Sequence, residues 1–333
     1  MPDKVKGSRI LVTGGAGFIG SHLTDELLSR GNNVVAIDNL INGKEENLKT
    51  AQTHQNFSFI KGDILNDNDL HNAMKDVDVV FHMACLGVRH SINHPYENHL
   101  VNAEGTLKVL MMAREMNVKK LIYISSSEIY GRALSFPIKE SDTPYPITVY
   151  GASKLVGEHY VNSFHECYGM DTTIIRMFNN FGPRAHYEGD SGEVIPRTIV
   201  NALYGKNPVI FGDGKISKDF IYVKDTARIL ADMIDVKEIT NQTFNIGSGE
   251  EISIKELMEQ ILSIIGNAKL NIQYDAPRPA DVPRLLVDSK KLRKKYNYKL
   301  HYNLSQGLAE TVLFYQELMK AKNLIQEIPQ KNW

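Results

Sequence analysis

The stretch VTGGAGFIGSH (12–22) follows a short apolar run and carries three glycines at a spacing that decides the fold. Gly14, Gly17 and Gly20 permit a tight turn, close approach of the backbone to a pyrophosphate, and close packing of a helix on a strand. The helix that follows offers free N–H groups and a partial positive charge to phosphates. The spacing therefore predicts a dinucleotide site where the first strand becomes the first helix.

Acidic residues follow the next two apolar runs. Asp38 ends NVVAID (33–38), near the offset of roughly 20 residues expected for an acid that binds a ribose. Its carboxylate can accept hydrogen bonds from both ribose hydroxyls and would repel a 2′-phosphate, which favours NAD over NADP. Asp63, in KGDI, is expected to meet the adenine, although a solvated turn acid explains this position equally well.

The first half of the chain alternates between two patterns. Short runs rich in β-branched residues predict strands buried on both faces, at 9–14, 33–38, 57–63, 77–84, 119–125 and 171–178. Amphipathic segments predict helices at 20–31, 102–117 and 149–169. This alternation implies βαβ units, and therefore an α/β fold built on a doubly wound (Rossmann) parallel sheet.

The alternation of strand-like and helix-like segments ends after residue 178. The stretch 181–197 is long, polar and rich in Gly and Pro, which suits a binding loop. Shorter elements follow it. We expect residues 1–178 to form an NAD-binding domain, with a return segment near 215–248. Residues 179–333 should form mainly a smaller, discontinuous substrate-binding lobe.

The bulk properties are those of a soluble globular protein. The 333 residues are 42% apolar and 23% charged, and this length favours two lobes. The net charge of −1 gives no electrostatic reason to expect nucleic acid or an anionic membrane as partner. The longest apolar runs fall short of the roughly 20 residues needed to cross a bilayer.

Two further features concern the compartment. The opening MPDKVKGSRILVTG is polar before it enters a strand, so no signal peptide is expected. Cys85 and Cys167 cannot form a disulfide framework, and neither has a metal-ligand partner at finger spacing. We therefore expect a reduced, cytoplasmic protein without a metal.

A candidate reactive group begins with SSSEIYG (125–131), at the end of the fifth expected strand. Downstream, Tyr150 and Lys154 lie one helical turn apart, which puts a phenol and an ammonium on one face. A phenol has a reference pKa of about 10, and a nearby cation favours phenolate. Lys154 is therefore expected to lower the pKa of Tyr150, which then removes a hydroxyl proton. Ser126 or a neighbour would hold the same substrate oxygen for hydride transfer.

With these pieces in place, the chain resembles an extended short-chain dehydrogenase/reductase of the nucleotide-sugar epimerase/dehydratase family. The resemblance runs from TGGAGFIG to a helix near 303–322. The matching pieces are TGGAGFIG (13–20), DN (38–39), GDI (62–64), HMAC…V…S…P (82–95), N…GT (102–106), SSSEIYG, YGASK (150–154), RMFNNFGPR (176–184), DFIYVKD (219–225) and RPADV (278–282).

The resemblance implies a nucleoside-diphosphate sugar in the C-terminal lobe and oxidation of its C4 hydroxyl by tightly held NAD⁺. It implies cofactor contacts from Gly14, Gly17, Phe18, Ile19, Gly20, Asp38, Asn39, Asp63, Ile64, Ala84, Asn102, Tyr150 and Lys154. On the substrate side it implies contacts from Val88, from Asn179 and Arg278 to the diphosphate, and from Val194 to the nucleobase.

Some positions leave the substrate contacts open. Lys218 stands where the family usually has arginine, and an ammonium meets a phosphate only as a point charge. Lys218 therefore either contacts a substrate phosphate as a point charge or, because it lacks the arginine fork, does not contact the substrate. Arg89, His90 and His186 either face the sugar or are solvated loop residues.

Glu128 bears on the reaction that follows C4 oxidation. By resemblance, 4-epimerases carry small or hydroxyl residues here, whereas 4,6-dehydratases and glucuronate decarboxylases carry glutamate. A C4 ketone acidifies the C5 proton, which a carboxylate can remove before water leaves from C6. Glu128 therefore favours dehydration. Ser127 occupies the place of an aspartate acid found in some dehydratases, and serine there resembles the decarboxylases and the GDP-sugar dehydratases. Epimerisation also stays open, since a glutamate that only caps the turn or pairs with a loop cation explains this position too.

Two rival classes remain. A non-catalytic NAD-binding sensor should have lost Tyr150 or Lys154, and both are present. A simple alcohol dehydrogenase gives no reason for Asn179, Arg278 and the long second lobe. By resemblance we also expect a homodimer, paired through helices near 96–116 and 148–168.

Overall fold

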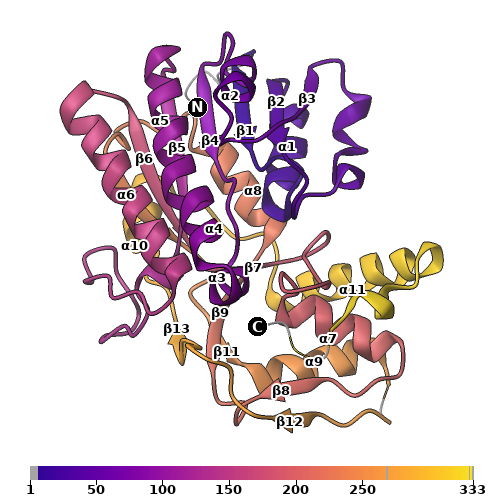
Figure 1. Cartoon of the computed structure of the whole chain (residues 1–333). Coiled ribbons are helices and arrows are strands. Elements are labelled where there is room, and N and C mark those ends of the chain that lie inside the picture. The colour runs from indigo at the N-terminus through magenta and orange to yellow at the C-terminus, as the bar shows by residue number, and fades with distance from the viewer. Residues whose placement is uncertain (1–6, 268, 330, 332–333) are drawn as a thin grey trace.

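A seven-stranded parallel sheet forms the centre of the larger lobe (Figure 1). The computed structural model describes residues 7–267, 269–329 and 331. The strand order is β10-β6-β5-β4-β1-β2-β3. The strands are β1 (Arg9–Thr13), β2 (Asn33–Asp38), β3 (Phe57–Lys61), β4 (Val79–His82), β5 (Lys120–Ser126), β6 (Thr172–Met177) and β10 (Gln242–Ile246).

Helices cover both faces of this sheet. One face packs against α1 (Phe18–Ser29), α8 (Val223–Asp232) and α10 (Lys290–Lys295). The other packs against α2 (Asp67–Ala73), α5 (Gly105–Glu115) and α6 (Val149–Tyr168). The predicted doubly wound fold is confirmed, and its strands are buried on both faces because each is covered twice.

The strand order reverses between β1 and β4, and this switch point locates the site. In doubly wound sheets, ligands bind outside the carboxyl ends of the strands at such a point. The chain from β4 to α5 passes through three short helical segments that border this crevice. They are α3 (Val88–Asn93), α4 (Pro95–His99) and the π-helical turn η3 (Leu100–Glu104).

The second lobe has its own sheets and core. A four-stranded sheet contains β7 (Asn179–Phe181), β9 (Ser217–Tyr222), β11 (Glu251–Ser253) and β13 (Arg284–Leu285). A two-stranded sheet pairs β8 (Val209–Phe211) with β12 (Gln273–Asp275). Three helices pack around a separate apolar core: α7 (Val194–Leu203), α9 (Ile254–Ile265) and α11 (Leu304–Ala321). Short helical turns complete the chain at η1 (Glu45–Leu48), η2 (Ala51–Thr53), η4 (Ser127–Ile129) and η5 (Leu324–Glu327).

The return segment expected near 215–248 is divided between the two sheets. Its first strand, β9, pairs with β7, β11 and β13 in the second lobe. Its later elements, α8 and β10, join the larger lobe, where β10 pairs in parallel with β6. Helix α10 also returns to the larger lobe, which the sequence did not indicate.

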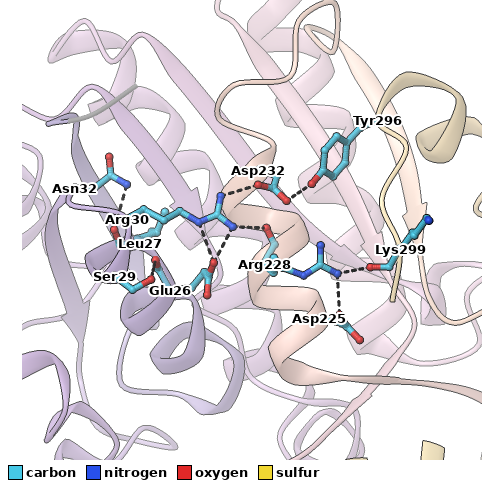
Figure 2. Close-up of polar contacts among 10 residues, drawn as sticks. All are labelled: Glu26, Leu27, Ser29, Arg30, Asn32, Asp225, Arg228, Asp232, Tyr296 and Lys299. Carbon is cyan, nitrogen blue, oxygen red and sulfur yellow. Dashed lines mark hydrogen bonds and ion pairs between the residues drawn. The ribbon is translucent and has the colours of Figure 1, made fainter. Parts of the chain in front are cut away.

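A polar network fastens α8 to α1 (Figure 2). Arg30 donates to the carboxylates of Glu26 at 2.9 Å and Asp232 at 2.7 Å. Asp232 also accepts from the Tyr296 hydroxyl, beyond the end of α10. Arg228 pairs with Asp225 within α8 at 2.8 Å. The returning helix is thus held by ion pairs as well as by the apolar contacts beneath it.

In the part of the chain that the structure describes, no helix is long and apolar enough to cross a bilayer. Cys85 and Cys167 are both free and exposed. The first six residues, which carry most of the sequence evidence on a signal peptide, lie outside the described residues.

Candidate active site

A cavity of about 480 Å³ lies at the carboxyl ends of the large sheet, between the two lobes. Nearly all predicted site residues line it: Gly14, Gly17, Phe18, Ile19, Gly20, Asp38, Asn39, Asp63, Ile64, Ala84, Val88, Ser126, Ser127, Glu128, Tyr150, Lys154, Asn179, Val194, Lys218 and Arg278. Arg89, His90 and His186 line it as well. The topology therefore brings together residues from widely separated parts of the sequence.

The glycine turn leaves a bare backbone against the cavity. Gly14 has a positive φ of 69°, and a Cβ there would come within 2.9 Å of the Ala84 backbone. A Cβ at Gly20 would clash with the carbonyl of Gly14, so the start of α1 packs directly on the turn. These positions need glycine, and the resulting surface fits a pyrophosphate at a helix N-terminus.

Asp38 is held at the end of β2 beside this turn. Its carboxylate accepts from the backbone N–H groups of Ala16 at 3.0 Å and Leu40 at 2.8 Å. Burial raises the pKa of Asp38, and these hydrogen bonds oppose that rise. Farther along the cavity, Asn39 donates to Asp63 at 2.9 Å, so the two polar residues expected on the adenosine side act as a pair.

Tyr150 and Lys154 both enter the cavity, but their pairing differs from the expectation. Burial raises the pKa of Tyr150 above its usual range, and a hydrogen bond with Ser126 opposes the rise. The Lys154 ammonium lies 4.6 Å from the centre of the Tyr123 ring, and burial lowers its pKa. The prediction that Lys154 lowers the pKa of Tyr150 is therefore wrong, because desolvation of the phenol dominates and raises this pKa.

The SSSEIYG segment divides into supporting and cavity-facing residues. Ser125 donates to Glu158 at 2.5 Å, and Glu158 forms a buried ion pair with Arg176 at 2.7 Å. Tyr130 receives a hydrogen bond from Arg176 at 2.8 Å. These outer residues fix the segment in place. Ser126, Ser127 and Glu128 are then left at the cavity wall.

Glu128 is half-buried and carries no direct partner. Within the described chain, its carboxylate has neither a hydrogen bond nor an ion pair, while its N–H donates to the Ser126 hydroxyl at 3.2 Å. Burial raises the pKa of Glu128, and the negative charge of Asp281 adds to this rise. The cations Lys218 and Arg89 lower the same pKa. A cavity-lining carboxyl group that has no partner and a raised pKa is available to exchange a proton with a ligand.

The substrate-side residues show how the second lobe contributes. Arg278 stacks on Phe211 with its guanidinium 4.6 Å from the ring centre, and burial lowers the pKa of Arg278 to about 9. Lys218 donates to the carbonyl of Val282 at 2.8 Å. Asn179 donates to the carbonyl of Asp219 at 3.0 Å, which leaves its amide oxygen toward other partners.

Asn102 differs from the other predicted cofactor residues, because it does not line the cavity. Its amide accepts from Leu86 N–H and donates to the Leu86 carbonyl, both at 2.9 Å. It therefore shapes the segment after β4 from behind. Among the described residues, no cluster of His, Cys, Asp and Glu is arranged to hold a metal ion.

Some cavity residues were not predicted as part of the site. Cys85 lines the cavity and acts on the Lys154 ammonium, whereas the sequence showed it only as an unpaired cysteine. Glu193 directly precedes α7, and Asp281 lies in the RPADV stretch. The available signals were weak: an acid directly before a helix, and an acid beside a predicted arginine contact.

The family assignment comes from comparison with known proteins. The sequence model described as "NAD dependent epimerase/dehydratase family" matches residues 10–247. The chain belongs to this family. It is an extended short-chain dehydrogenase/reductase that acts on nucleotide sugars, as the resemblance implied. NAD is its cofactor, and the glycine turn, Asp38 and Lys154 along one cavity fit that molecule.

Relatives within the family catalyse different reactions. A putative UDP-glucose 4-epimerase of Methanocaldococcus jannaschii is 36% identical, over 91% of this chain and 97% of that protein. A UDP-N-acetylglucosamine 4-epimerase from Methanobrevibacter ruminantium, solved in complex with UDP-N-acetylmuramic acid, is 38% identical with a TM-score of 0.88, covering 95% and 100%. DesIV, a dTDP-glucose 4,6-dehydratase from Streptomyces venezuelae solved with NAD bound, is 29% identical with a TM-score of 0.89, covering 94% and 98%.

Proposed function

We propose that the protein oxidises C4 of a nucleoside-diphosphate hexose and then eliminates water across C5 and C6. The observation that carries this proposal is the Glu128 carboxylate, which lines the same cavity as Tyr150 and Lys154. Within the described chain this carboxylate has no hydrogen-bond or ion-pair partner, so it is available to take a proton from the substrate. An epimerase needs no such base, because it only returns hydride to the other face of the keto sugar.

The first step depends on Tyr150, Ser126 and Lys154. Bound NAD⁺ would supply the hydride acceptor for C4 and the hydride donor for C6. Tyr150 takes the proton of the C4 hydroxyl, and Ser126 holds the same oxygen in line. Burial opposes phenolate formation, and the hydrogen bond with Ser126 partly offsets this effect.

The second step depends on Glu128. The C4 ketone acidifies the C5 proton, which moves to the Glu128 carboxylate. The electron pair of the C5–H bond forms the C5–C6 double bond as the C6–O bond breaks, and a general acid at the cavity wall gives the departing oxygen the proton with which it leaves as water. Arg278 and the amide of Asn179 hold the diphosphate, so the sugar remains positioned during both steps. Glu128 then returns its proton to C5.

A second candidate is 4-epimerisation, which the relatives favour. The epimerases described above are 36% and 38% identical to this chain, whereas the dehydratase is 29% identical. In that reaction the keto sugar rotates between oxidation and reduction, so that hydride returns to its other face. Glu128 then affects the sugar only through its charge and does not act as a base.

The product mixture tests the proposal. The purified protein is incubated with UDP-, dTDP- and GDP-hexoses and with the corresponding uronates, and the products are identified by mass and by sugar analysis. Loss of water from a hexose supports dehydration. An unchanged mass with altered sugar identity establishes epimerisation, and loss of carbon dioxide from a uronate establishes decarboxylation; either outcome would overturn the dehydratase assignment.

We also propose a homodimer in a reduced, cytoplasmic setting. Exposed apolar residues, Tyr96, Met111 and Val149, lie on the neighbouring helices α4, α5 and α6. Cys85 is a free thiol beside the reactive group, which suits a reducing compartment. Light scattering of the purified protein at several concentrations gives the oligomeric state, and a monomer at all concentrations would contradict the dimer.

A further inference from the structure

Elimination of water needs a proton donor, and the base cannot supply it. Once Glu128 has taken the C5 proton, hydroxide still has to leave C6, and it leaves readily only when a second group protonates it. The other carboxyl groups at the cavity wall are Asp38, Asp63, Asp190, Glu193 and Asp281. Asp38 and Asp63 lie on the adenosine side, and Asp281 is exposed to solvent.

Glu193 lines the same cavity as Tyr150 and belongs to the second lobe. It precedes α7 in extended conformation, with φ −91° and ψ 161°. Its N–H donates to the His186 carbonyl at 2.7 Å and its carbonyl accepts from Arg197 at 3.1 Å, so the backbone is fixed on both sides. Its half-buried carboxylate has no hydrogen bond or ion pair within the described chain.

Glu193 has a larger effect on the Tyr150 phenol than Asp190. Among the carboxylates, Glu128 and Glu193 make the largest contributions there, and both raise the pKa of Tyr150. One comes from the end of β5 and the other from the start of α7. The two carboxyl groups therefore reach one cavity from different lobes.

The two carboxyl groups have different surroundings. Burial raises the pKa of Glu193 to about 7, Glu188 adds to the rise, and His186 and Arg89 oppose it. Glu128 faces the cations Lys218 and Arg89, which favour its ionised form. Near neutral pH, a good part of Glu193 thus carries a proton. Paired titratable groups in unlike surroundings are the usual basis of an acid and base assignment.

We propose that Glu193 is the general acid of the elimination, protonating the C6 hydroxyl as Glu128 removes the C5 proton. The C5–H electron pair becomes the second bond between C5 and C6, the C6–O pair leaves with oxygen, and the Glu193 proton completes the water. Arg89 acts on both carboxyl groups and helps to hold their charges in balance. This inference rests on the dehydration proposed above.

The test is Glu193→Gln, which keeps the shape of the side chain and removes the acid. Wild type, Glu193→Gln and Glu193→Asp are incubated with the accepted nucleotide hexose in D2O. Glu259→Gln, on the exposed face of α9, is the control for loss of a carboxylate far from the cavity. Three rates are measured: appearance of reduced nicotinamide, deuterium incorporation at C5, and loss of water.

The expected result is selective. Glu193→Gln should retain nicotinamide reduction and C5 exchange within a few-fold, while water loss falls by roughly 10²–10⁴-fold. Glu193→Asp should recover part of the water loss, and Glu259→Gln should match wild type. Water loss at the wild-type rate in Glu193→Gln would overturn the inference and leave the dehydratase proposal standing. A wild type that epimerises its substrate without C5 exchange would overturn both.

Discussion

The Lys154 ammonium lies 4.6 Å from the centre of the Tyr123 ring, and the Tyr123 hydroxyl donates to the Lys154 carbonyl at 3.2 Å. Strand β5 therefore positions Lys154 through a cation–π contact and a hydrogen bond to its backbone. Both residues are buried. Tyr123, a residue of the sheet, thus fixes the position of Lys154, and it does so independently of Tyr150, one helical turn away.

Removal of the ring should disturb Lys154. A desolvated cation–π contact contributes on the order of 2 kcal/mol, so Tyr123→Leu should weaken NAD binding and slow C4 oxidation by up to about 30-fold. Tyr123→Phe keeps the ring and should lose little activity. Isothermal titration with NAD and single-turnover absorbance measure the two effects. Equal activity of Tyr123→Leu and Tyr123→Phe would show that the ring does not position Lys154.

Asp38 should set the choice of cofactor. A hydrogen bond to a charged group contributes about 1.5–3 kcal/mol, so Asp38→Asn should lower the affinity for NAD roughly tenfold or more. The same change removes the repulsion of a 2′-phosphate and should raise relative affinity for NADP. Titration of both cofactors into wild type and variant measures the ratio. An unchanged ratio in a folded variant would contradict the role of Asp38.

The Arg176–Glu158 ion pair should be a large contributor to stability. Both side chains are buried, at 8% and 4% exposure, and the pair is bidentate. Loss of one partner leaves an uncompensated buried charge, so Glu158→Leu should lower the free energy of unfolding by about 3–5 kcal/mol. Replacing both, with Arg176→Met, should recover much of this loss. Urea unfolding curves provide the values, and a single-variant loss below about 1 kcal/mol would be inconsistent with the pair's burial.

Glu193 should make stability fall as pH rises. Its pKa is about 7 in the folded protein, against an ordinary value of 4.5. Below 4.5 the group is protonated in both states, and no penalty applies. Between 4.5 and 7 the folded protein holds the proton more tightly than the unfolded chain, so unfolding becomes progressively easier. The total change reaches up to about 3 kcal/mol above pH 7.

Glu193→Gln removes this dependence. The stability of the variant relative to wild type should therefore increase between pH 4.5 and pH 8, as measured by urea unfolding across the range. A constant difference over this interval would show that the carboxyl group keeps its ordinary pKa in the folded protein.

Much of the larger lobe could be predicted from local patterns. Runs of β-branched residues predicted β1 to β6 but not β10 as strands of the sheet, and the glycine spacing predicted the turn where Gly14 meets Ala84. The four-residue spacing of Tyr150 and Lys154 put both into the cavity, because residues one helical turn apart share a face. These features depend on neighbours close in sequence, so the sequence alone expresses them.

The remaining features depend on contacts distant in sequence. Lys218 donates to the Val282 carbonyl because β13 pairs with β9. No residue pattern in the sequence predicts this strand pairing. Glu193 enters the site only through the placement of α7 against the larger lobe. The sign of the Tyr150 pKa shift also escaped prediction, since it depends on how far the assembled cavity excludes water.

The most direct test of the account uses Glu128→Gln in D2O, with the nucleotide hexose that wild type accepts. C4 oxidation should proceed, visible as reduced nicotinamide, while deuterium incorporation at C5 and loss of water both fall by roughly 10²–10⁴-fold. Tyr150→Phe, as the companion variant, should fail already at C4 oxidation. Normal C5 exchange and normal product in Glu128→Gln would contradict the central claim that this carboxylate is the base.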